Sequence, residues 1–280
     1  MARGRLVIPE GADAKLLRKM YRDAQAIRLA YYKKQHQRFA RGCEINMEAG
    51  RLLAESQGIK PQRETKEIKA RRLALRNKIH RMGRKPRPLR GFRGHNPLQF
   101  PPFNAGQGIA NGGSGVVEWD PWGPDSVQGK TGGRLAVWQS SRPSSGSAYA
   151  ATDVGFWYYS ATFGTLFVTL YTYVIGYGYL YAPYQATYAS AYASAVVQVN
   201  GPSGILSNSP TEVYWKGVGG PNSDYSDPSG YYFAQTAAPV AANTWYLILG
   251  GTVQDVWAGP DADAQVDAYT HINFFGFYQE

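Results

Sequence analysis

The sequence predicts a segregated α+β protein, in which a basic N-terminal helical segment precedes an antiparallel β-sandwich. The first observation is charge: residues 1–95 hold 26 Lys and Arg against 8 Asp and Glu, a net of +18, whereas residues 96–280 have a net of −8. The second is periodicity, which is helical in the first part and two-residue alternating in the second. A jelly-roll-like or immunoglobulin-like sandwich fits such a pattern.

The first predicted helix covers residues 12 to about 40. Asp13 is a suitable N-cap. Apolar residues at three- and four-residue steps predict the buried face, which would consist of Leu16, Met20, Ala24, Ile27 and Tyr31. Eight Lys and Arg residues lie outside this face, and Gly42 is expected to break or kink the helix.

Two further helices are expected within residues 1–82. One runs from about 44 to 57, ends at Gly58 as the C′ residue, and would bury Ile45, Ala49, Leu52 and Leu53. The other runs from about 62 to 82. The segment after Leu52 resembles the first half of a helix-turn-helix, but Glu64 and Glu67 stand where a recognition helix needs apolar residues. A plain helical hairpin is therefore expected.

Residues 83–115 have the composition of an extended linker arm. Five prolines favour extended backbone, and several glycines add turns. The first part of this arm, 83–93, is the most basic short run of the chain. Such an arm could lie along phosphates or insert into a neighbouring subunit, and a plain tether is the alternative.

From residue 116 to 280 the signals are those of a β-sandwich domain, and residues 164–184 are the most typical. Their even positions are mostly aliphatic and their odd positions form a row of phenol rings. A bend or hairpin is expected at Gly176 or Gly178 because the run exceeds the usual strand length. Turn clusters separate the predicted strands, which are 116–119, 134–140, 148–160, 164–181, 186–199, 211–216, 230–236, 244–257 and 262–278.

Two strands have clear core faces. In 186–199 the odd positions are small or β-branched, running from Thr187 through four alanines to Val199. In 262–278 the even positions from Ala262 to Ile272 are the apolar ones. A small-residue face of this kind lets two sheets approach closely, or lies opposite large aromatic side chains.

The chain contains no recognisable catalytic motif, so no enzymatic activity and no cofactor are expected. Gly-Lys-Ser/Thr phosphate loops, GxSxG and HExxH are all missing from the sequence. Cys43 is the only cysteine, and the four histidines are scattered, so no zinc site is expected. Asp261, Asp263 and Asp267 are weak calcium candidates, and solvated turn residues are the simpler interpretation.

The sequence has no signal-peptide core and no long apolar helix. We therefore expect no membrane insertion, and a cytoplasmic or virion-associated location.

The leading functional expectation is a non-enzymatic structural protein that assembles with copies of itself into a shell, tube, filament or virion component. In plan, a basic arm followed by a β-sandwich resembles many viral coat and appendage proteins, which is a fold-level analogy. The expected assembly residues are aromatic: Phe92, Phe100, Phe103, Tyr171, Tyr173, Tyr177, Tyr179 and Tyr181.

Two alternatives remain open. Residues 1–95 could bind DNA or RNA, or an acidic protein, without sequence preference. The candidate contacts are Arg71, Arg72, Arg76, Lys78, Arg81, Arg84, Lys85, Arg87, Arg90 and Arg93. The β-sandwich could instead bind carbohydrate, because its seven tryptophans and many tyrosines could stack on sugar rings.

Overall fold

One long helix and two antiparallel β-sheets make up the described structure, which confirms the segregated α+β prediction. The computed structural model describes residues 5–59, 70, 98–99, 105–111, 131–140 and 146–280. The helix is α1 (Ala14–Ser56). The strands are β1 (Arg5–Leu6), β2 (Leu98–Gln99), β3 (Ala105–Asn111), β4 (Thr131–Ser140), β5 (Gly146–Ser160), β6 (Gly164–Ala182), β7 (Tyr188–Gly201), β8 (Gly204–Gly219), β9 (Asn222–Ser226), β10 (Gly230–Val240), β11 (Thr244–Ala258) and β12 (Asp263–Gln279).

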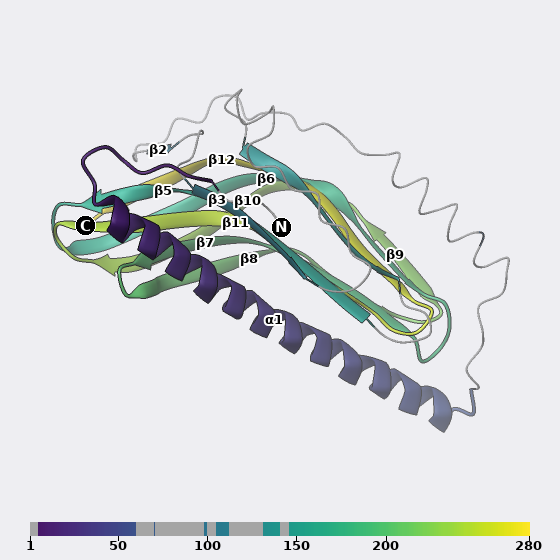
Figure 1. Cartoon of the computed structure of the whole chain (residues 1–280). Coiled ribbons are helices and arrows are strands. Elements are labelled where there is room, and N and C mark those ends of the chain that lie inside the picture. The colour runs from purple at the N-terminus through teal and green to yellow at the C-terminus, as the bar shows by residue number, and fades with distance from the viewer. Residues whose placement is uncertain (1–4, 60–69, 71–97, 100–104, 112–130, 141–145) are drawn as a thin grey trace.

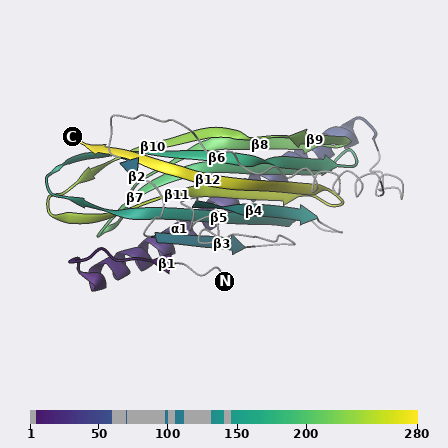
Figure 2. The ribbon, with the colours of Figure 1, turned by 90° about the horizontal axis from the view of Figure 1, so that it is seen from above.

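The two sheets pack face to face as a sandwich. Sheet A has the order β1-β3-β5-β11-β7-β8, and sheet B has the order β10-β6-β12-β2, with β4 also paired to β12 and β9 to β6. The strands of both sheets run close to one long axis (Figure 2). Helix α1 runs lengthwise along the outer face of sheet A, where it contacts β7, β8, β11 and β5 (Figure 1). The layers are therefore α1, sheet A and sheet B.

The core lies between the sheets and follows the alternation of the sequence. Strand β7 contributes its small-residue face, which is buried from Ala189 through to Val199 as predicted, and Thr187 just before the strand is buried too. The aliphatic face of β6 is buried opposite it, including Leu166, Val168 and Leu170. Burial of such side chains is the main favourable contribution to folding.

Strand β6 is continuous, so a hairpin at Gly176 or Gly178, one of the two predicted possibilities, is wrong. The strand pairs with β12 without interruption across both glycines, and the register irregularity in this pair lies in β12, between Ile272 and Phe274. Strands β9 and β10 pair along the other side of β6. Pairing with β12 therefore continues through both glycines, which excludes a hairpin there.

Helix α1 is also continuous, so the predicted break at Gly42 is wrong. Both predicted ends are confirmed. Asp13 accepts hydrogen bonds from the backbone N–H groups of Lys15 (2.9 Å) and Leu16 (3.1 Å). At the other end Gly58 has φ +69°, and Ile59 N–H donates to the Ala54 carbonyl at 2.9 Å, which is a Schellman cap.

The buried side of α1 differs from the predicted one. Met20 and Ala24 are buried as expected, but Leu16 and Ile27 are exposed. The four apolar residues expected inward in the second segment are all exposed; they are Ile45, Ala49, Leu52 and Leu53.

The actual seam of α1 includes Tyr21, Tyr32, Cys43 and Ala54, each eleven residues after the one before. An eleven-residue repeat corresponds to about 3.67 residues per turn, whereas an α-helix has about 3.6. The buried side therefore shifts gradually around the helix axis. It also includes Arg28, a charged residue that no apolar pattern would place inside.

Several predictions lie outside the described residues: the helix at 62–82 except residue 70, the strand at 116–119 and most of the linker at 83–115. Within that linker, β2 pairs with β12 and β3 pairs with β5. Among the described helical residues, no stretch is long and apolar enough to cross a membrane.

Candidate functional site

The outer face of sheet B carries the predicted row of aromatic side chains, extended by residues of β10 and β12. Cross-strand ring pairs form there, among them Tyr173 with Tyr231 (centroids 4.5 Å apart), Tyr171 with Phe233 (5.0 Å) and Phe167 with Tyr278 (4.7 Å). Such pairs stabilise neighbouring strands. We call these six residues the aromatic face.

Part of the aromatic face is open to solvent. Tyr231 is 45% exposed and Phe233 51%, whereas Tyr171 and Tyr173 are half-buried. Of the other predicted tyrosines, Tyr181 is half-buried and packs against Tyr179, which is buried. The exposed aromatic surface is therefore centred on β10, a strand that the sequence analysis did not include in the interface.

A second exposed apolar surface lies on the C-terminal half of α1. Ile45, Ala49, Leu52 and Leu53 form a stripe along one side of the helix, and we call them the α1 stripe. Ile45, Leu52 and Leu53 are each more than half exposed. Cys43 and Ala54, on the other side of the helix, are buried, and Cys43 lies against sheet A. The stripe therefore points away from the sandwich.

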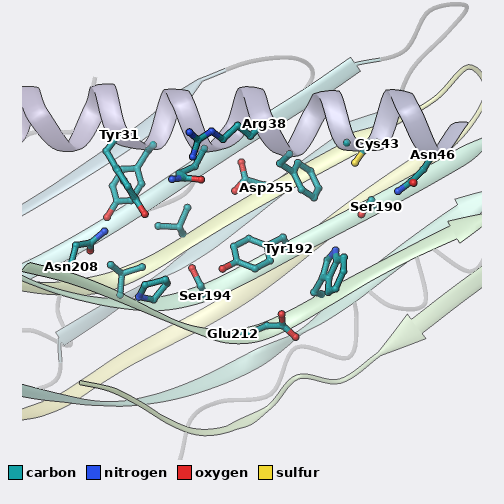
Figure 3. A pocket seen from close by; sticks show the side chains of 18 of the residues that line it. Tyr31, Arg38, Cys43, Asn46, Ser190, Tyr192, Ser194, Asn208, Glu212 and Asp255 are labelled. Carbon is teal, nitrogen blue, oxygen red and sulfur yellow. The ribbon is translucent and has the colours of Figure 1, made fainter. Parts of the chain in front are cut away.

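A groove of about 510 Å³ runs between α1 and the outer face of sheet A (Figure 3). Helix α1 forms one wall over the segment 31–46. Strands β7, β8 and β11 form the floor and the other wall. Aromatic side chains line both sides, including Tyr31 and Phe39 from α1, Tyr188 and Tyr192 from β7, and Trp215 from β8. This volume is in the range of small-molecule sites.

A buried ion pair fixes α1 at one end of the groove. Arg28 of α1 pairs with Asp153 of β5, and its guanidinium also donates to the Tyr32 hydroxyl. Both charged side chains are almost completely buried. Burial raises the pKa of Tyr32, while the nearby Arg28 acts in the opposite direction. The pair thus ties the helix to sheet A at a defined position.

A second polar contact crosses the helix–sheet interface near the middle of the groove. His36 Nδ1 lies 2.7 Å from Asp255 Oδ1, and His36 Nε2 lies 3.0 Å from Ser147 Oγ. Burial raises the pKa of the Asp255 carboxyl, and the hydrogen bond with His36 lowers it. Asp255 therefore sits on the groove floor with its carboxylate already engaged by the helix.

At the far end, Cys43 and Asn46 of α1 lie over β7 (Figure 3). Asn46 Nδ2 donates to the Tyr188 hydroxyl at 3.3 Å. Burial raises the pKa of the Cys43 thiol to about 12, although a hydrogen bond with Ser190 acts in the opposite direction. A thiol held in this neutral form is a poor nucleophile.

Four polar side chains of the groove make no hydrogen bond or ion pair within the described part of the chain. They are Gln35 and Arg38 from α1, and Asn208 and Glu212 from β8. The Asn208 Oδ1 atom is buried and has no partner among those residues. A buried carbonyl oxygen without a partner costs free energy, which a bound ligand or water would recover.

The described structure neither tests the predicted charged sites nor supports the predicted metal site. All ten candidate Arg and Lys residues and the three arm phenylalanines lie outside the described residues, as does the side chain of Tyr177. The described residues contain no group of three or more His, Cys, Asp or Glu placed to hold a metal ion. Asp261 accepts a hydrogen bond from Tyr184 (3.4 Å), and Asp263 is buried on β12.

The groove was not predicted from the sequence, although one signal was present. The even positions of β7, opposite its alanine face, are Tyr188, Ser190, Tyr192 and Ser194. Alternating rings and hydroxyls are unusual for a purely solvated face, and here they form the groove floor.

Comparison with known proteins does not assign a family. No family model and no curated protein matches the sequence. Among solved structures, the carbohydrate-binding module TmCBM61 in complex with β-1,4-galactotriose is 14% identical, with a TM-score of 0.23 over 65% of this chain and 91% of that one. The family 22 carbohydrate-binding module of Clostridium thermocellum Xyn10B is 11% identical (TM-score 0.19; 60% and 86% covered). Infectious bursal disease virus, Gx strain, is 8% identical (TM-score 0.16; 70% and 47%). At these TM-scores the similarities support no functional inference.

Proposed function

We propose that the protein is a non-enzymatic structural subunit that assembles with copies of itself. The observation that carries this proposal is the presence of exposed apolar side chains on two opposite sides of the layered molecule. The aromatic face lies on the outside of sheet B, and the α1 stripe points away from sheet A. Contiguous exposed apolar surface on a water-soluble domain is typical of interaction sites.

Two different patches favour a head-to-tail contact. If the aromatic face of one copy meets the α1 stripe of the next, each copy still has one free patch of each kind. Such heterologous contacts produce rings when the rotation closes and filaments or tubes when it does not. The geometry therefore favours a repeating assembly over a closed two-fold dimer.

The apolar side chains would supply most of the association free energy. Burying one Leu or Phe side chain contributes roughly 1.5–3 kcal/mol, whereas an exposed ion pair contributes about 0–1 kcal/mol. Ion pairs border the α1 stripe, where Arg51 Nε donates to Glu48 Oε2 at 2.9 Å and Arg51 also pairs with Glu55. These charges fit a role in orienting the contact.

The test is the size distribution in solution, measured by sedimentation velocity at micromolar concentration. We expect oligomers for the unmodified chain and a shift towards monomer for the double variant Leu52→Ser/Leu53→Ser. Leu29→Ser is the matched control, because Leu29 is an exposed leucine of α1 outside the stripe. On sheet B, Phe233→Ser should act like the stripe variant, and Phe163→Ser, in an exposed turn, should not.

Two results would reject the proposal. One is a stable monomer for the unmodified chain at all concentrations measured. The other is an equal effect of the stripe variant and its Leu29 control, which would indicate general surface hydrophobicity and not a defined contact.

A second candidate function, binding of nucleic acid, is favoured by the charge of α1. From Lys15 to Arg41 the helix carries nine Lys and Arg and a single acid, Asp23, and all the basic residues except Arg28 are exposed. A duplex DNA would release counterions on binding, so the log of the affinity should fall with log salt by about 0.9 per phosphate neutralised. Fluorescence anisotropy with mixed-sequence DNA would show no binding at low salt if this candidate is wrong.

A further inference from the structure

The groove between α1 and sheet A has the features of a ligand site that assembly does not require. It contains aromatic rings on both walls and polar side chains that the described chain leaves without partners. Trp215 is 64% exposed on its outer wall. A large indole kept in solvent at the rim of a groove is costly unless a ligand or partner covers it.

The charge of the lining limits the class of ligand. Arg38 and Glu212 offset one another, and Asp255 is already engaged by His36. A phosphorylated or carboxylated ligand would need an excess of cations, and a cationic ligand would need an excess of free carboxylates. The balance favours a ligand without net charge.

The polar side chains that line the groove limit the class of ligand further. Asn208 and Gln35 each offer an amide donor and an acceptor, Glu212 offers acceptors, and Arg38 offers donors. A ligand that uses all of them must both donate and accept at several points. Hydroxyl groups do this, and the C–H faces of a pyranose ring are apolar enough to stack on an aromatic side chain.

The shape agrees with an extended ligand. The lining residues of α1 run from Tyr31 to Asn46, about four turns of helix. In Figure 3, Tyr31 and Asn46 lie at opposite ends of the view, with Tyr192 and Asp255 between them. A chain of a few sugar units would occupy such a groove lengthwise.

We propose that this groove binds a short neutral saccharide. Trp215 and Tyr192 provide stacking surfaces, and Asn208, Gln35, Arg38 and Glu212 bind the hydroxyl groups. The aromatic face of sheet B is the competing location for a stacked sugar, and the experiment below separates the two.

Isothermal titration calorimetry on the full chain tests the proposal with soluble neutral trisaccharides of glucose, mannose, xylose or galactose. Trigalacturonate is the anionic counterpart of similar shape. We expect at least one neutral trisaccharide to bind with a dissociation constant in the millimolar range or tighter, and more tightly than trigalacturonate. Trp215→Ala should weaken binding at least about tenfold, and Phe233→Ala on the aromatic face should leave it unchanged.

Three outcomes would overturn the proposal: no neutral trisaccharide binds at millimolar concentration, trigalacturonate binds more tightly than every neutral one, or Phe233→Ala abolishes binding while Trp215→Ala does not. Because Trp215 is exposed, its removal should leave the melting temperature unchanged, and Trp215→Phe should retain binding if stacking is its role. Sedimentation of the same variants distinguishes loss of the sugar site from loss of assembly.

Discussion

The ring of Tyr214 on β8 lies directly against Gly178 on β6. A Cβ atom at residue 178 would lie 2.3 Å from Tyr214 Cζ and 2.5 Å from its hydroxyl oxygen. These residues belong to opposite sheets, so the missing side chain at Gly178 sets how closely the sheets approach here. A glycine that suggested a bend in the sequence is instead a packing position.

Gly178→Ala should therefore destabilise the sandwich. The added methyl group must displace a buried aromatic ring, and overpacking of this kind costs about 1–3 kcal/mol. Urea unfolding should show a lower midpoint with an unchanged m-value. Gly219→Ala is the control, because a Cβ there meets nothing within 4 Å. Equal loss in both variants would assign the effect to backbone freedom and not to Tyr214.

Arg28→Leu should loosen α1 from sheet A. The change leaves Asp153 buried without its cation, and breaking a buried ion pair on one side costs about 3–5 kcal/mol. Limited proteolysis and thermal unfolding would both report the loss, and Arg22→Leu, at an exposed position of the same helix, should be nearly neutral. The double variant Arg28→Leu/Asp153→Leu should lose less than the sum of the two single changes.

Cys43 should resist thiol reagents in the folded protein. It is buried on the side of α1 that faces sheet A, and burial raises its pKa to about 12, so little thiolate is present at neutral pH. An absorbance assay with an aromatic disulfide reagent should detect the thiol only after denaturant is added. Rapid reaction of the native protein would mean that the helix opens from the sheet frequently.

Alkaline pH should destabilise the protein partly through Tyr21. Burial, with a smaller contribution from Asp153, raises its pKa from 10.0 to about 12. The unfolded chain then loses its proton first, so the contribution of Tyr21 is complete below pH 10 and is lost as the pH rises through about 12. Tyr21→Phe should flatten the fall in melting temperature over that window, and an unchanged slope would contradict this.

The sandwich could be predicted because two-residue alternation separates the side chains of each strand into two faces and indicates which face forms the core. Ala189 and Ala191 alternate with Ser190 and Tyr192, and only one of these sets can form a core. The same argument predicts that Leu166 and Val168 of β6 belong to the core. Strand partners could not be predicted, since pairing depends on contacts between distant parts of the chain.

The seam of α1 and the groove could not be predicted by hydrophobicity. Leu16 and Ile27 match a helical apolar stripe, yet the seam instead uses Arg28, which is buried only because Asp153 of β5 lies opposite it. The groove likewise depends on residues from α1, β7 and β8 that are far apart in sequence. No local pattern contains that information.

Strand β12 follows every other described strand in the chain, yet it lies inside sheet B, with β6 along one side and β4 and β2 along the other. Hydrogen bonds in an antiparallel ladder run perpendicular to the strands. A pull along the C-terminal end of β12 would therefore load both ladders in shear, so that many bonds must rupture together. A pull across the sheet would open them one after another. The subunit should thus bear tension best along its long axis, the direction in which its strands run.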